Sequence, residues 1–162
     1  MNTAHLHLMV NHLSIVGLGF AIFVTLIALY RKNPEIEKLA CWFYILTGLL
    51  SALAILTGDG TGEIVKTYPG ISNDAIEYHE TWGYVFFYTL ASISALAIAA
   101  LWFSRKNPLI LRKFILTILI LALLSLFLAF QTGTTGGKIR HPEIDNGKFN
   151  GCLLYTSDAA DE

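Results

Sequence analysis

Apolar residues in this chain are gathered into four long stretches separated by short polar segments. The stretches cover residues 12–30, 39–56, 81–103 and 109–131, and none has an acidic or basic residue in its middle. Each is close to the roughly 20 residues with which a helix crosses a hydrocarbon core of about 30 Å. The pattern therefore predicts an all-α fold, an integral membrane four-helix bundle with up-down-up-down topology.

Composition and segment lengths divide the chain around these helices. Hydrophobic residues make up 54% of the chain and charged residues 14%, against about 25% charged residues in a soluble domain. The first stretch is unlike a cleaved signal peptide, because no basic residue precedes it and it is too long. We expect an N-terminal arm at residues 1–11, a four-helix domain at 12–132 with an outer loop at 57–80, and a truncated tail at 133–151.

The positions of Lys and Arg predict the orientation of the bundle. Most of them lie in or beside the first and third connections between helices, namely Arg31, Lys32, Lys38, Arg105, Lys106, Arg112 and Lys113. Basic residues favour the cytoplasmic side of a membrane, so both termini and the second connection are expected outside. In a bacterium this describes a multi-pass protein of the inner membrane, with periplasmic termini and the lipid bilayer as its first partner.

The end of the chain has an unusual sequence. Residues 152–162 read CLLYTSDAADE, which resembles a translated sequencing adapter. We expect an environmental (metagenomic) source, a native chain cut off near residue 151, and no functional role for the adapter residues. Without them Cys41 is the only cysteine and the net charge is about +2 rather than −1. Neither a disulfide nor a cysteine-based metal site is then expected.

Histidines gather at the predicted outer end of the bundle. The stretch HLHLMVNH, at residues 5–12, places three of them beside the first apolar stretch. No two of the three are three or four residues apart, so a single helix cannot chelate a metal ion with them. Asn11 is a good N-cap, and a helix that starts there leaves residues 5–10 as an arm over the bundle mouth.

Ligands from separate elements could converge at this mouth. Histidines from two helices with an apolar slot between them can bind haem b, and imidazole also suits transition metal ions. His12 and His79 are the first candidates as cofactor or metal ligands, followed by His7 and His141. The residues expected to orient these rings or to complete the ligand shell are Glu63, Glu80, Arg140 and Glu143.

The histidines have two simpler interpretations. They could join a buried hydrogen-bond network in a non-catalytic accessory or structural membrane subunit, or they could anchor helices at the membrane interface. No catalytic motif, intramembrane proton-relay pattern or nucleic-acid signature is visible in the sequence. The chain is therefore not expected to be an enzyme by itself or to bind nucleic acid.

Three motifs resemble those of a known family. They are HLHLMVNHLSIVGLGF at residues 5–20, HETWGY at 79–84 and GGKIRHPEI at 136–144. Together they resemble a bacterial membrane-protein family known only as domain of unknown function 2231, whose members open with a His-x4-His pair, here His7 and His12, and usually have Pro where this chain has Ser14. The resemblance implies a small four-helix membrane domain, sometimes joined to Rieske-type iron–sulfur modules. It suggests electron transfer with a cytochrome or iron–sulfur protein as partner, and a homo-oligomer is also open.

Overall fold

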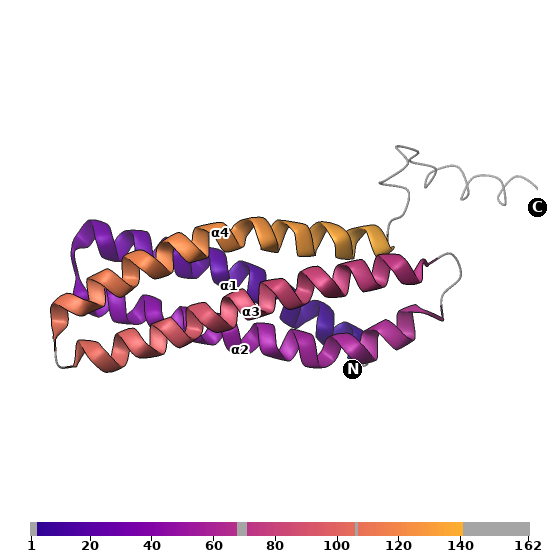
Figure 1. The fold of residues 1–162 in the computed structure, drawn as a ribbon, viewed down its shortest axis with the longest axis horizontal. Helices are drawn as coiled ribbons and strands as arrows, with labels where there is room; N and C mark the ends of the chain where they lie inside the picture. Colours follow the sequence, from indigo (N-terminus) through magenta and orange to yellow (C-terminus); the bar gives the residue numbers. More distant parts are fainter. Residues whose placement is uncertain (1–2, 68–70, 106, 141–162) are drawn as a thin grey trace, which may run out of the picture.

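Four long helices make up the fold. The computed structural model describes residues 3–67, 71–105 and 107–140, within which no strand occurs. The helices are α1 (Thr3–Arg31), α2 (Pro34–Val65), α3 (Asn73–Ser104) and α4 (Pro108–Arg140), and each is long and apolar enough to cross a membrane. Figure 1 shows the α1–α2 and α3–α4 connections at one end of an elongated bundle. The predicted all-α class with four long apolar helices is confirmed.

The predicted N-terminal arm is wrong over the residues that the structure describes. Helix α1 begins at Thr3, so Asn11 lies inside the helix and does not cap it. Ser14 fits this continuous helix, because its hydroxyl donates to the Val10 carbonyl one turn earlier at 2.8 Å. Polar residues near the end of a membrane helix do not stop it as long as its backbone hydrogen bonds continue.

Most of the predicted outer loop is also helical. Residues 57–65 extend α2, and α3 already begins at Asn73 after the predicted N-cap Ser72, whose side chain makes no capping bond. Helix α4 likewise continues to Arg140, through the first part of the predicted tail. The glycines of GDGTGE cost roughly 1 kcal/mol each in a helix, and packing against neighbouring helices overrides that preference. The remaining tail and the adapter-like residues lie outside the described residues.

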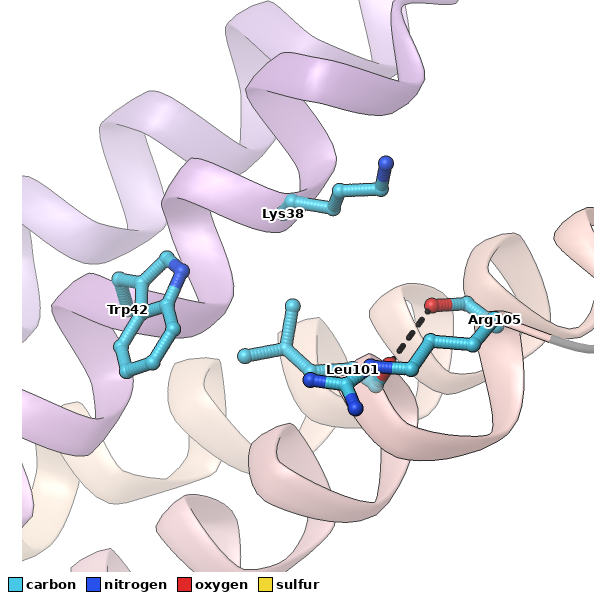
Figure 2. Close-up of a pocket in the computed structure, with 5 residues that line it drawn as sticks. Lys38, Trp42, Leu101 and Arg105 are labelled. Atoms are coloured by element: carbon cyan, nitrogen blue, oxygen red, sulfur yellow. Dashed lines mark hydrogen bonds between the residues drawn. The ribbon is translucent and has the colours of Figure 1, made fainter.

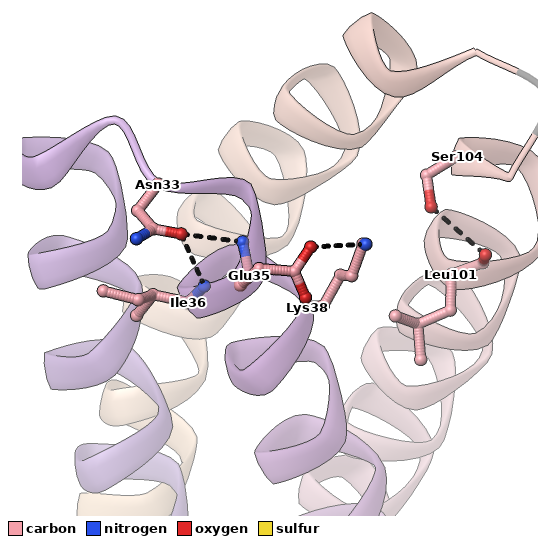
Figure 3. A network of polar contacts seen from close by, with 6 residues as sticks. All are labelled: Asn33, Glu35, Ile36, Lys38, Leu101 and Ser104. Atoms are coloured by element: carbon pink, nitrogen blue, oxygen red, sulfur yellow. Dashed lines mark hydrogen bonds and ion pairs between the residues drawn. The ribbon is translucent and has the colours of Figure 1, made fainter.

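A capped turn begins α2 at the basic end of the bundle. Figure 3 shows the Asn33 side-chain oxygen accepting hydrogen bonds from the backbone N–H groups of Glu35 and Ile36, at 2.9 and 3.4 Å. Pro34 follows at the first helical position, where its missing N–H costs no helical bond. Lys32, with φ of 50°, turns the chain between the two helices.

Small residues allow α2 and α3 to approach closely in the middle of the bundle. A Cβ added at Gly48 would lie 3.0 Å from the Ser94 Cβ and would overlap the Ser94 hydroxyl. That hydroxyl donates to the Tyr44 carbonyl at 2.9 Å, which ties α3 to α2. Close backbone approach and interhelical hydrogen bonds of this kind are typical of membrane helices.

Buried charges occur at the basic end of the bundle. The Glu37 side chain is only 4% exposed, and Arg112 of α4 donates to it at 3.1 Å. A second nitrogen of Arg112 lies 3.5 Å from the Leu29 carbonyl near the end of α1. One guanidinium therefore joins three helices.

The outer surface of the helices is apolar. Large hydrophobic side chains are exposed along all four of them, among others Phe20, Phe23, Trp42, Leu49, Tyr88, Leu124 and Phe127. A soluble protein rarely exposes contiguous apolar surface of this extent. The surface suits a lipid bilayer, in which these side chains face acyl chains rather than water.

Candidate functional site

The histidines of α1 and α3 lie at the end of the bundle opposite the two short connections. Residues 5–12 are near the start of α1 and His79 is in the second turn of α3. His141 and Glu143, the other predicted members of the site, lie outside the described residues. The site is therefore built from the two helix starts and from the ends of α2 and α4 that pack against them.

His7 is half-buried and directed at α2. Its Nδ1 lies 2.9 Å from the Ala54 carbonyl and 3.3 Å from the Thr57 hydroxyl. A carbonyl only accepts, so a neutral His7 carries its proton on Nδ1 and keeps a lone pair on Nε2. The ring lies against the backbone of Gly58, where a Cβ would come within 3.4 Å of Cε1.

His79 is half-buried as well and directed at α4. Its Nδ1 lies 3.0 Å from the Thr135 hydroxyl. That hydroxyl has one hydrogen to donate and lies 2.9 Å from the Gln131 carbonyl and 3.1 Å from the Thr132 carbonyl. With its hydrogen used there, Thr135 accepts from Nδ1 of a neutral His79, which again leaves the lone pair on Nε2.

His12 does not share these surroundings. It is exposed on α1, and its Nδ1 bonds to the Leu8 carbonyl one turn earlier at 2.6 Å. His7, not His12, is the histidine whose charge acts on His79. On a continuous helix, five residues rotate the side chain by about 140°. His7 and His12 consequently face different sides of α1.

The predicted supporting residues have other contacts. Glu63 is exposed and pairs with Lys66 at 2.8 Å, and this hydrogen bond, together with the charge of Glu63, raises the pKa of Lys66. Glu80 is exposed and lies over α2, since a Cβ added at Gly62 would be 3.2 Å from its Oε1. Arg140 is the last residue of α4. The described contacts bring neither carboxylate to an imidazole nitrogen.

Gly136 is the residue of this site whose role the sequence did not reveal. A Cβ there would lie 2.9 Å from Cε1 and 3.3 Å from Nδ1 of His79. Gly137, the next residue, has no such neighbour within 4 Å. The only signal for Gly136 was its place in the GGKIRHPEI motif, and Thr135 and Ala54 carried no signal because their partners are far away in sequence.

Comparison with protein-family models, with curated proteins and with solved structures found no match to this chain. The resemblance to the family of unknown function therefore depends on the three motifs alone. The chemistry of the site is argued below from its own residues.

The fit of a cofactor differs between haem and a metal ion. A haem needs a flat apolar slot between its two axial ligands, whereas each ring here packs against the backbone of a neighbouring helix, at Gly58 or Gly136. An ion needs only free lone pairs. Within residues 3–67, 71–105 and 107–140, however, no group of three His, Cys, Asp or Glu side chains is placed to hold a metal ion. His7 and His79 could supply two ligands of a site that needs more.

We expect Gly136→Ala to displace the His79 ring, because the new methyl group and Cε1 cannot occupy the same space. Gly137→Ala is the matched control, with the same change of composition and open space around it. The measurement is the ¹⁵N spectrum of the imidazole nitrogens in detergent, with His79→Gln to assign the signals. A Gly136→Ala spectrum identical to that of wild type would show that the ring does not lie against α4.

Proposed function

We propose that this chain is a multi-pass protein of the bacterial inner membrane that binds a transition metal ion at its periplasmic end, with His7 and His79 as ligands. The observation that supports this is the state of the two rings, both of which bond through Nδ1 and keep a lone pair on Nε2. Metal-ligating histidines typically use their second nitrogen in this way, which fixes tautomer and orientation.

An electron-transfer role deepens this proposal. A bound copper or iron ion would supply one-electron transfer, and the motif resemblance suggests a cytochrome or iron–sulfur protein as the redox partner. His141, five residues after Gly136 in the sequence, is the predicted further ligand. The orientation follows from the basic residues at the opposite end of the bundle, which favour the cytoplasm.

A structural role is the second candidate function. The bond from His7 to the Ala54 carbonyl joins α1 to α2, and the bond between His79 and Thr135 joins α3 to α4. An interhelical hydrogen bond in a membrane contributes roughly 0.6 kcal/mol on average. These two bonds would hold the helix pairs together in an accessory subunit without any metal.

Metal analysis of the detergent-purified protein separates the two functions. After loading with Cu²⁺ or Zn²⁺ and removal of excess metal, we expect about one equivalent per chain in wild type, by analogy with other single-ion sites. His7→Ala and His79→Ala should lose that metal, and His12→Ala should retain it. Metal should also raise the melting temperature of wild type alone, because a ligand that binds only the folded state stabilises it.

The opposite results would be equally informative. A metal-free wild type whose stability falls in both His7→Ala and His79→Ala would support the structural role and overturn the metal site. Loss of metal in His12→Ala alone would restore the ligand predicted first from the sequence. A visible spectrum of the same sample, oxidised and dithionite-reduced, tests haem, since a Soret band with sharp reduced bands would replace the ion by haem b.

A further inference from the structure

A groove lies between α2 and α3 at the basic end of the bundle, far from the histidines. Its volume is about 230 Å³, and its lining consists of Lys38, Trp42, Leu101, Ser104 and Arg105 (Figure 2). Lys38 and Trp42 belong to α2, and the other three residues to the end of α3. The groove is therefore open at the level where both helices meet their connections.

Polar and apolar groups are ordered along this groove in the same way on both helices. On α2, Trp42 is one turn further into the bundle than Lys38. On α3, Leu101 is one turn further in than Arg105. One turn is about 5.4 Å along a helix. Two cations thus lie at the mouth of the groove and two large apolar side chains lie beneath them.

The cations at the mouth are available to an anion. Lys38 is paired with Glu35 at 2.8 Å, but the Glu35 side chain is 78% exposed. Such an exposed pair contributes little and exchanges readily with solvent. Arg105 packs over the Trp102 ring at 5.5 Å, and no carboxylate pairs with it among the described residues.

The wider surroundings also favour an anion. The described residues of this end include six basic side chains but only the two carboxylates of Glu35 and Glu37, both already paired. The basic side chains are Arg31, Lys32, Lys38, Arg105, Arg112 and Lys113. Under the proposed orientation they face the cytoplasmic leaflet, which carries anionic lipids.

We propose that this groove binds one anionic phospholipid of the cytoplasmic leaflet, with its phosphate between Lys38 and Arg105 and an acyl chain against Trp42 and Leu101. Basic pockets between transmembrane helices on this side of a membrane bind such headgroups. The apolar depth of the groove distinguishes a lipid from a free phosphate ion, which needs only the cations. The proposal does not depend on the metal site, which lies at the other end of the bundle.

The test uses the full chain reconstituted in phosphatidylcholine vesicles, to which phosphatidylglycerol with brominated acyl chains is added. Bromine quenches tryptophan fluorescence at contact, and Trp42→Phe identifies the signal of the groove. We expect half-maximal quenching at a low fraction of phosphatidylglycerol and an affinity about 25-fold lower in Lys38→Gln/Arg105→Gln. This figure takes about a factor of five for each basic residue near an anionic surface.

Two controls are matched to this double variant. Arg31→Gln/Lys113→Gln removes the same charge from the same end without touching the groove and should stay within about twofold of wild type, because a diffuse field is screened over a Debye length. Lys38→Arg/Arg105→Lys keeps both charges and should retain binding. Equal losses in the two Gln double variants would overturn the proposal in favour of general attraction of the basic end to anionic lipid.

Two further arms distinguish the occupants. Brominated phosphatidylcholine at the same fraction should quench Trp42 less than phosphatidylglycerol, and equal quenching would mean ordinary lipid contact and no site. Inorganic phosphate at millimolar concentration should not displace the lipid. Displacement by phosphate would assign the two cations to a free anion and would overturn a lipid site.

Discussion

Arg112→Ala is expected to lower the free energy of unfolding by about 3 kcal/mol, the largest single effect we predict. The carboxylate of Glu37 is 4% exposed and loses its only ion-pair partner in this variant. The Arg112 side chain is itself 43% exposed, so water reaches the pair from one side and the effect belongs at the low end of the range for buried pairs. The bond to the Leu29 carbonyl, which links α1 to the pair, is lost as well.

Thermal unfolding in detergent, followed by circular dichroism, measures this effect. Lys38→Ala is the control, because it removes an exposed ion pair with Glu35 on the same end of α2 and should cost less than about 1 kcal/mol. The double variant Glu37→Leu/Arg112→Met should recover most of the loss, since replacing both partners leaves no buried charge unpaired. A loss as small as that of Lys38→Ala would show that Glu37 is protonated or hydrated in the folded protein.

Gly48→Ala is expected to cost about 2 kcal/mol, the usual range for overpacking a close contact being about 1–3 kcal/mol. Its methyl group would overlap the Ser94 hydroxyl and would lie 3.4 Å from the Leu90 carbonyl of α3. Rotation of Ser94 cannot relieve the contact completely, because the Ser94 Cβ is only 3.0 Å from the added atom. The two helices must separate, and the bond from Ser94 to the Tyr44 carbonyl weakens with them.

The matched control for this prediction is Gly19→Ala, at a position with no neighbour within 4 Å. Alanine favours a helix over glycine by up to about 1 kcal/mol, so this variant should be neutral or slightly more stable in the same melting experiment. Gly48→Ala/Ser94→Gly should regain stability by restoring space on the other helix. If Gly48→Ala melts like Gly19→Ala, the close approach of α2 and α3 at this point is wrong.

The site shows where reasoning from the sequence was correct and where it was not. Histidines at one end of the bundle followed from the alternating direction of four helices, and His7 and His79 of the described chain are there. The choice of His12 over His7 depended on a helix starting at Asn11. With α1 starting at Thr3, the rotation of every later side chain around α1 is set by the packing of that helix. His7 faces α2 and His12 faces outward.

The sequence by itself determined the four apolar helices, their order and the basic character of the two short connections. These properties are sums over many residues, so single exceptions hardly change them. Only the tertiary structure decided where the helices end, that Gly136 makes room for His79, and that Arg112 pairs with Glu37 75 positions away. Each of these depends on one side chain meeting one partner from another helix, and that meeting is set by helix rotation and close packing, which no local pattern records.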